Sequence, residues 1–297
     1  MEFFTLNDGI KVPVLCFGPG MLNRGFKPKH GFFGKISNRI WKYNNERSYI
    51  NALCSAIDSG ARFFDTSAVY GNEALIAEAI EKTGCDRKDF ILTTRVSNTA
   101  QFQGNVRDVI LKSVAKFKTD YVDLLMFHWP VTDKFVTTYN ELIKLKDEGV
   151  CRSIGVANCH EHHLKLLIES TGVIPSINQV EVHPLLSQKA LIKFCNDYGI
   201  RVEAYTPLAR MDERMTRLPL LKEISLKYEK TLSQVILRWH IQNGVIPVFR
   251  SLNADRQKEN FDVFDFVLDA EDMKKIDGIN INSRLRYDPD NCDFTIL

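Results

Sequence analysis

The stretch FFDTSAVYGNEALIAEAI (Phe63–Ile80) joins a short apolar run, a polar loop and a helical pattern. Its aromatic start predicts a buried strand, and Glu73–Thr83 has the apolar spacing of an amphipathic helix. The loop between them carries Asp65 and Tyr70. A tight connection needs neither an acid nor a phenol, since Gly, Ser or Asn would serve. The loop is therefore a candidate proton-handling site.

The same unit of a strand followed by a helix recurs along the chain. Short apolar runs predict strands at 14–18, 62–65, 90–94, 122–128, 153–157, 177–181, 201–205 and 245–249. Helical patterns follow at about 47–59, 73–83, 106–117, 139–147, 162–170, 188–198, 220–228, 231–242 and 254–262. The helix at 231–242 opens with a capping box, Thr231-Leu-Ser-Gln234. Eight parallel strands, many continuously apolar and each followed by a helix, are what a closed barrel requires.

The fold class that we predict is therefore α/β, a single-domain (β/α)8 TIM barrel. The length of 297 residues fits such a barrel of ~250 residues with additions. An open doubly wound sheet is the competing fold, and it usually carries G-x-G-x-x-G after its first strand. Here Gly18-Pro19-Gly20 is followed by Met-Leu-Asn, and no Pro-, Gly- or Ser-rich linker divides the chain. We predict one domain over 1–297, with an inserted loop at 21–45 and a C-terminal tail at 278–297.

Composition limits the possible partners. With 39 basic and 37 acidic residues the formal charge is only +2, so we expect neither nucleic acid nor an anionic membrane as a partner. The N-terminal sequence does not resemble a signal peptide, and no apolar run approaches the ~20 residues that span a bilayer. The seven cysteines form no CxxC pairs, which argues against structural zinc and disulfides. We expect a cytoplasmic protein with reduced thiols, monomeric or weakly oligomeric.

Polar and aromatic residues follow nearly every predicted strand. In a barrel the chemistry lies at the carboxyl ends of the strands, so these residues should share one rim. They are Asp65, Tyr70, Arg95, His128, Trp129, Asn158, Gln179, His183, Tyr205, Arg250, Ser251 and Arg256. Each alone is weak evidence, but their joint placement predicts a functional site.

The motifs DTSAVYGNE, DYVDLLMFHWP, SIGVAN, INQVEVHP and AYTPL, in this order, resemble those of the aldo-keto reductase family. The resemblance runs from about Leu6 to the C-terminus. It implies a (β/α)8 barrel that binds NADPH (NADP), usually in preference to NADH, and reduces aldehydes and ketones without a metal. Family members share an Asp, Tyr, Lys and His tetrad. Asp65, Tyr70 and His128 match three of these positions, while the lysine position is Arg95 here.

Physical chemistry gives each of these four residues a role. Tyr70 would donate the proton, and a neighbouring cation would bring its pKa closer to the working pH. Arg95 would be that cation, Asp65 would hold it in place, and neutral His128 would hydrogen-bond the carbonyl oxygen. The substrate pocket would include Tyr70, His128 and Trp129. A buried structural ion pair is the alternative interpretation of Asp65 and Arg95.

By the same resemblance, Asn158 and Gln179 would hydrogen-bond the nicotinamide carboxamide, and Tyr205 would stack on the ring. Ala157 stands where a serine is common. The further cofactor contacts that the resemblance implies are Asp65, Thr206, Leu208, Arg250, Ser251, Arg256 and Asn260. Two arginines and a hydroxyl after the eighth strand suit the 2′-phosphate. A solvated helix start is the alternative for Arg250 and Arg256.

Three other features need an interpretation. The run Cys159-His160-Glu161-His162-His163 is not H-E-x-x-H, and we expect a solvated helical turn and no metal. Cys195 is expected to be packed in a helix. The basic, aromatic segment 21–45 is longer than the usual family loop, so it could shape the substrate pocket, bind a partner or be a mobile insertion.

The main functional hypothesis is an NADPH-dependent reductase of small aldehydes or ketones. The alternative is an NADP-binding barrel with weak or lost catalysis, which acts as a sensor or interaction module. Arg95 and the basic insertion favour the alternative. The full set of Asp65, Tyr70 and His128 favours the enzyme, because a protein that only binds has no need for all three. The sequence does not identify the substrate.

Overall fold

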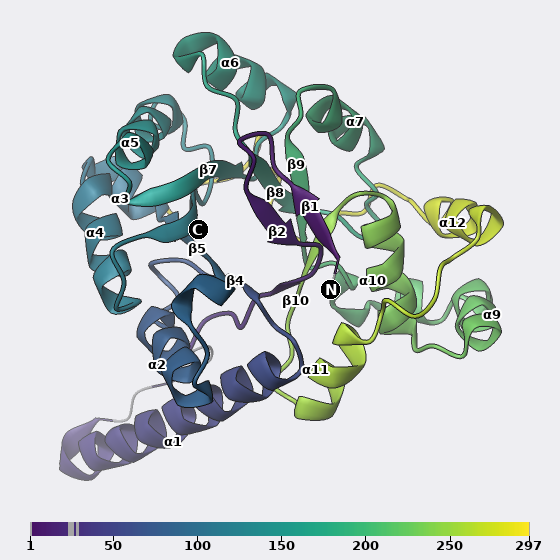
Figure 1. Ribbon diagram of the computed structural model, residues 1–297, viewed down its shortest axis with the longest axis horizontal. Helices are drawn as coiled ribbons and strands as arrows, with labels where there is room; N and C mark the ends of the chain where they lie inside the picture. The colour runs from purple at the N-terminus through teal and green to yellow at the C-terminus, as the bar shows by residue number, and fades with distance from the viewer. Residues whose placement is uncertain (1, 23–26, 28–29, 297) are drawn as a thin grey trace.

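Apolar runs form the eight strands of the barrel, as the sequence predicts. The strands are β3 (Cys16–Phe17), β4 (Phe63–Asp65), β5 (Ile91–Val96), β6 (Val122–Phe127), β7 (Cys151–Ala157), β8 (Ile177–Glu181), β9 (Arg201–Tyr205) and β10 (Ile246–Phe249). In the computed structural model, which describes residues 2–22, 27 and 30–296, they pair in parallel and close in the order β10-β3-β4-β5-β6-β7-β8-β9 (Figure 1). Closure excludes the open doubly wound sheet.

Helices surround the barrel on its outside. They are α1 (Gly31–Asp58), α2 (Glu73–Thr83), α3 (Asn98–Gln103), α4 (Val106–Lys116), α5 (Phe135–Asp147), α6 (Glu161–Thr171), α7 (Lys189–Asp197), α8 (Glu213–Thr216), α9 (Pro219–Tyr228), α10 (Leu232–Gln242), α11 (Ala254–Phe261) and α12 (Ala270–Asp277). Two short 3-10 turns, η1 (Arg87–Asp89) and η2 (Ala209–Met211), complete them. The predicted capping box of α10 is confirmed, because Thr231 and Gln234 exchange side-chain and backbone hydrogen bonds.

Alternation along the strands creates two separate apolar layers. Inward residues such as Phe63, Leu124 and Ile177 pack together inside the barrel. Their neighbours in sequence, such as Phe64 and Leu125, belong to the larger core beneath the helices. Because successive strand side chains alternate in direction, the same period carries Asp65 inward, two residues after Phe63.

A hairpin that the sequence analysis did not predict covers one end of the barrel. Strands β1 (Phe3–Thr5) and β2 (Lys11–Pro13) pair antiparallel, and the connection includes Gly9 at a φ of 86°. Leu6 and Val12 join the inner apolar cluster. The hairpin therefore excludes water from the end of the barrel opposite to the strand carboxyl ends (Figure 1).

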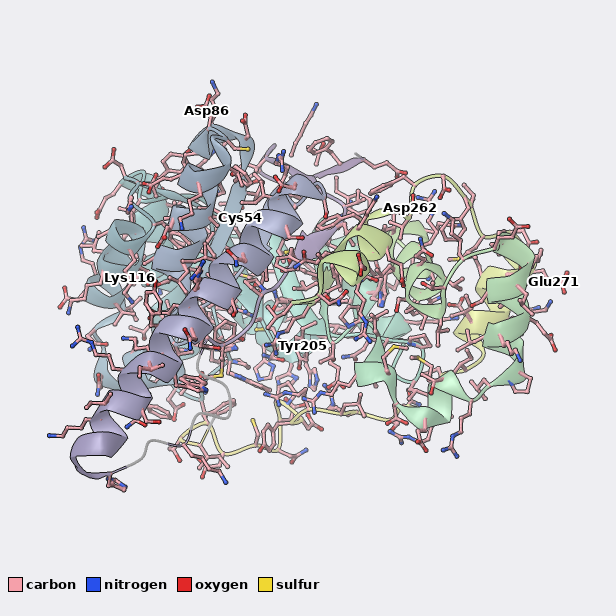
Figure 2. The ribbon with its side chains drawn as sticks, turned by 90° about the horizontal axis from the view of Figure 1, so that it is seen from below. Cys54, Asp86, Lys116, Tyr205, Asp262 and Glu271 are labelled. Atoms are coloured by element: carbon pink, nitrogen blue, oxygen red, sulfur yellow. The ribbon has the colours of Figure 1, made fainter. Side chains whose placement is uncertain are left out.

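The long helix α1 corrects two predictions. The sequence predicts a helix from about Arg47 and a loop over 21–45, but the helix begins at Gly31, so both are wrong over 31–45. The rest of the insertion lies partly outside the described residues. Residues 35–44 of α1 bury no side chain and leave apolar ones such as Ile40 and Tyr43 exposed. Without a stripe facing the core, the periodicity of these residues gave no helical signal. Figures 1 and 2 show this half projecting beyond the barrel.

Despite the length of α1, no helix in the described ranges is both long and apolar enough to cross a bilayer.

Candidate active site

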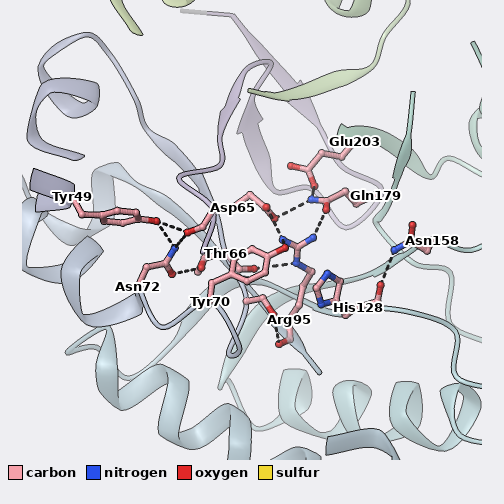
Figure 3. Close-up of polar contacts among 12 residues, drawn as sticks. Tyr49, Asp65, Thr66, Tyr70, Asn72, Arg95, His128, Asn158, Gln179 and Glu203 are labelled. Carbon is pink, nitrogen blue, oxygen red and sulfur yellow. Dashed lines mark hydrogen bonds and ion pairs between the residues drawn. The ribbon is translucent and has the colours of Figure 1, made fainter. Parts of the chain in front are cut away.

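A buried ion pair forms the centre of the site. Asp65 ends β4 and Arg95 lies in the neighbouring strand β5, and both side chains point into the barrel (Figure 3). The guanidinium of Arg95 donates to Asp65 Oδ2 at 2.7 Å, and its Nε donates to the Thr66 carbonyl at 3.1 Å. Only 3% of Arg95 and 5% of Asp65 is exposed. The pair is thus held in a medium where each charge needs its partner.

Gln179 and Glu203 extend this pair into a network. Gln179 accepts a hydrogen bond from Arg95, and its Nε2 donates to Asp65 Oδ1 at 2.9 Å and to Glu203 Oε2 at 2.8 Å. Both amide hydrogens and the amide oxygen are therefore in use. The structure places Gln179 in this network, where its oxygen keeps a second lone pair and the contact with a nicotinamide carboxamide stays a prediction.

The sequence analysis missed Glu203. The available signal was an acid two residues before Tyr205 in the apolar run RVEAY, where period-two alternation turns both side chains inward. Glu203 is fully buried, and its Oε1 has no hydrogen-bond partner within the described residues.

Glu203 holds a proton at neutral pH. Burial, together with the charge of Asp65, raises its pKa to about 8. Burial also raises the pKa of Asp65, but Arg95 and Gln179 hydrogen-bond the Asp65 carboxylate and oppose this rise. Two adjacent buried acids do not both ionise readily, so the negative charge resides on Asp65, beside Arg95.

Tyr70 and His128 complete the group at the rim. The Tyr70 hydroxyl lies 3.4 Å from a guanidinium nitrogen of Arg95, and the two rings of Tyr70 and His128 are 5.9 Å apart between centroids. Burial lowers the pKa of His128 well below its usual value, and the charges of Arg95 and Arg286 contribute. His128 is therefore a neutral imidazole. The structure thus brings Asp65, Tyr70, Arg95 and His128 into one cluster.

Asn158 and Tyr205 lie beside this cluster. The Tyr205 hydroxyl donates to Asn158 Oδ1 at 2.7 Å, and Asn158 Nδ2 donates to the His128 carbonyl at 2.9 Å. Asn158 has a φ of 60°, a left-handed conformation that asparagine tolerates well. These bonds fix the Tyr205 ring next to His128. Trp129 is buried, and its ring lies 6.4 Å from that of Phe294 in the C-terminal tail.

A second network, also missed by the sequence analysis, shapes the loop that carries Tyr70. Asn72 donates to the Gly20 carbonyl at 2.8 Å and to the Tyr49 hydroxyl at 2.9 Å, and it accepts from Thr66. Tyr49 comes from α1 and also donates to the Gly20 carbonyl. Asn72 follows Tyr70 by two residues, so this network positions the phenol.

The segments after β9 and β10 contain the remaining residues that were predicted to contact the cofactor. Thr206 and Asn260 each have a buried side-chain oxygen without a hydrogen-bond partner in the described ranges. Arg250 and Arg256 are exposed, and Asn253 caps α11 by accepting from the Arg256 amide at 2.9 Å. Ser251 Oγ accepts from the Asn253 amide at 3.1 Å, whereas Leu208 is half-buried against the core.

These groups fit a dinucleotide phosphate. Two exposed guanidinium groups beside a capped helix N-terminus suit an anion, and the unpartnered oxygens can accept or donate to a polar ligand. At Gly20, which has a φ of 76°, an added Cβ would lie 3.1 Å from the Arg250 guanidinium. A side chain there would crowd the arginine.

The histidine run follows Asn158 directly and leads into α6. One ligand atom each of His160, His163 and Asp290 lies within 4.8 Å of the others. His163 Nδ1 accepts the backbone N–H of His160 at 3.1 Å, so its Nε2 must carry the hydrogen. His160 Nε2 faces Arg284 at 3.4 Å, and its Nδ1 faces Asp290 at 2.7 Å. This pattern describes hydrogen bonds between α6 and the tail, and it disfavours a metal.

Known proteins share both this sequence and this fold. The model of the aldo/keto reductase family matches residues 32–281. The uncharacterized oxidoreductase YtbE of Bacillus subtilis is 41% identical over 294 residues, which are 98% of this chain and 97% of that protein. The glyoxal reductase of Bacillus subtilis is 38% identical over 255 residues, 86% of this chain and 92% of that protein. The chain therefore belongs to the aldo/keto reductase family.

A solved relative bears on the cofactor. The Bombyx mori aldo-keto reductase, solved in complex with NADP, superimposes with a TM-score of 0.83 at 29% identity, covering 97% of this chain and 96% of that one. The predicted family and the predicted barrel are thus confirmed, and this relative binds NADP.

Glu203→Gln should flatten the dependence of stability on pH. In the unfolded chain this carboxyl loses its proton near its usual pKa of 4.5, but in the folded protein near 8. Between these values the unfolded state binds fewer protons, so stability falls as pH rises, on the order of a few kcal/mol for wild type. The glutamine variant should be the more stable protein at pH 8. Urea unfolding at pH 5.5 and 8 measures this effect.

Glu223→Gln, an exposed site on α9, is the matched control and should keep the wild-type slope. A slope that is the same in wild type and Glu203→Gln would show that Glu203 ionises normally.

Proposed function

We propose that the protein is an NADPH-dependent reductase of aldehydes or ketones, with Tyr70 as the proton donor. The observation that carries the proposal is the position of the Tyr70 hydroxyl. It lies within 3.4 Å of Arg95, which forms a buried ion pair with Asp65, and its ring lies beside neutral His128. These are the groups that carbonyl reduction needs at one point.

Each side chain of the site has a separate role in this proposal. Neutral His128 donates a hydrogen bond to the carbonyl oxygen and orients it toward Tyr70. Tyr70 gives its proton to this oxygen as the carbonyl becomes an alcohol, and the cation of Arg95 stabilises the phenolate that remains. Asp65 keeps Arg95 in place. When bound, NADPH supplies the hydride.

The chain's own residues also support a preference for NADPH as part of this proposal. Tyr205 offers a ring held by Asn158 for stacking against the nicotinamide. Arg250, Ser251 and Arg256 surround the capped start of α11, which suits the dianionic 2′-phosphate. By the family resemblance, Thr206, Leu208 and Asn260 would contact the cofactor as well, and Thr206 and Asn260 each have a buried oxygen without a partner in the described residues. Asn158 remains available for the carboxamide, because one of its amide hydrogens makes no hydrogen bond within the described residues.

One observation favours a second candidate, a barrel that binds NADPH with weak catalysis. The Arg95 guanidinium makes its short contacts with Asp65, Gln179 and the Thr66 carbonyl, and only a long one with Tyr70. Less positive charge is therefore directed at the phenol than a compact ammonium would supply.

Tyr70→Phe should lower turnover by at least ~10²-fold, at the scale of general-acid catalysis, while the ring and the fold are kept. NADPH oxidation with a panel of small aldehydes, together with NADPH binding by fluorescence, measures this. Near-normal reduction would assign the acid to another group. Wild-type binding without turnover on any aldehyde would favour the second candidate.

Arg256→Ala should weaken NADPH about 10- to 100-fold and leave NADH nearly unchanged. Only NADPH carries the 2′-phosphate, and a charge-assisted contact is worth ~1.5–3 kcal/mol. Lys258→Ala is the matched control, because it removes an exposed charge from the same helix. Equal losses for the two cofactors in Arg256→Ala would argue against a 2′-phosphate contact.

Arg95→Lys and Arg95→Met distinguish an adapted site from a decayed one. If the site is adapted to arginine, which we favour, lysine should lower turnover or barely change it, and methionine should lower it much more. Single-turnover hydride transfer to a reactive aldehyde, across pH, measures this. A tenfold rise with lysine, ~1.4 kcal/mol of barrier, would contradict adaptation.

Because Arg95→Met leaves Asp65 as an uncompensated buried charge, thermal unfolding of that variant must first establish that it is folded. Equal rates in all three folded proteins would remove Arg95 from the mechanism.

A further inference from the structure

Glu203 is a buried acid to which the proposed reaction assigns no role. It lies in β9, where it pairs in register with Gln179 of β8 and Ile246 of β10. Its side chain is fully buried, and no cation in the described ranges forms an ion pair with it. Its Oε2 accepts from Gln179, while its Oε1 has no hydrogen-bond partner in that part of the chain. A charge on this carboxyl would therefore have little to compensate it.

The neighbouring strands determine what faces Glu203. β4 and β5 contribute the ion pair of Asp65 and Arg95, and β10 contributes apolar side chains of the inner cluster. β3 contributes the thiol of Cys16, whose pKa is raised well above its usual value by burial and by the two acids. The thiol is thus uncharged. One cation therefore serves two buried acids.

The amide of Gln179 joins Glu203 to the ion pair (Figure 3). Its Nε2 donates one hydrogen bond to each acid, at 2.9 Å to Asp65 and at 2.8 Å to Glu203. Its oxygen accepts from Arg95, whose other terminal nitrogen lies 3.4 Å from the Tyr70 hydroxyl. A charge on Glu203 would thus lie two hydrogen bonds away from the guanidinium that faces the proton donor.

The charges of this group change when the proton is transferred. As Tyr70 gives its proton to the carbonyl oxygen, a phenolate forms beside Arg95. With Glu203 neutral, the guanidinium then balances two anions, the phenolate and Asp65. With Glu203 ionised, the same guanidinium would balance three. Because like charges repel strongly in a buried site, the phenolate would then form less readily.

We propose that Glu203 is a positioning residue for proton transfer, which leaves the charge of Arg95 to Tyr70 while it is neutral and slows reduction when it ionises. The inference rests on the proposed reductase function and adds a residue that regulates the same site. Burial and Asp65 raise the pKa of Glu203 to about 8, so the loss of rate occurs as the pH rises through this value. Below it, Glu203 keeps its proton and the rate is not reduced.

Glu203→Gln tests the proposal, because glutamine has nearly the same shape but cannot ionise. The measurement is single-turnover hydride transfer from NADPH to a reactive aldehyde, expressed as the ratio of the rate at pH 9 to that at pH 6.5. We expect this ratio to be about five- to tenfold lower in wild type than in Glu203→Gln. Glu223→Gln, on the exposed face of α9, is the matched control and should keep the wild-type ratio. A role in packing alone would change both rates and not their ratio.

A second measurement does not require turnover. The ultraviolet absorbance of phenolate is followed across pH, and the signal of Tyr70 is the difference between each protein and its Tyr70→Phe variant. We expect this signal to appear at a lower pH in Glu203→Gln than in wild type, because one buried negative charge is missing. Glu203→Met, a second variant that cannot ionise, should show the same change, which would assign the effect to the charge and not to the new amide.

The outcomes separate the possible failures. Equal rate ratios in wild type and Glu203→Gln would overturn the proposal, and so would coincident titrations of Tyr70 in the two proteins. If wild type reduces no aldehyde, the reductase function fails. The Tyr70 titration then still decides whether the charge of Glu203 reaches the phenol.

Discussion

The buried pair of Asp65 and Arg95 is the constraint to which the surrounding structure conforms. Removing both charges from water costs several kcal/mol per ion unless every donor and acceptor is satisfied. The Arg95 guanidinium donates hydrogen bonds to Thr66, Gln179 and Asp65. These bonds require that β4, β5 and β8 stay in register. Gly18 lies close by, where an added Cβ would come within 2.7 Å of Val248. The end of β3 therefore has no room for a side chain beside the pair.

The identity of the cation determines how the rest of the network is arranged. Arginine has five N–H donors in a planar fork, whereas lysine has three on a single nitrogen. The fork reaches Asp65 and Gln179 together, and Gln179 then bridges to Glu203. A protonated Glu203 lets this extra acid remain buried beside Asp65 without a second charge. The departure from the resemblance at Arg95 thus affects residues on three strands.

Periodicity predicted the barrel because its strands and most of its helices carry regular apolar patterns. It missed the first half of α1, which buries no such stripe, and the hairpin of β1 and β2, whose three-residue strands are too short for a pattern. Their positions after predicted strands led to Asp65, Tyr70, Arg95 and His128 as candidate site residues. They did not identify Glu203, whose importance depends on contacts across the barrel.

Charge is distributed differently with depth in this barrel. Inside, one carboxylate balances one guanidinium, and the second acid is protonated, so the centre is neutral overall. At the rim, Arg250, Arg256 and Arg286 form no ion pair with an acid in the described part of the chain. Such exposed charges contribute little by themselves, because water and salt screen them. They become strong only when a bound anion displaces that water, so an anionic ligand itself creates the conditions in which the rim holds it.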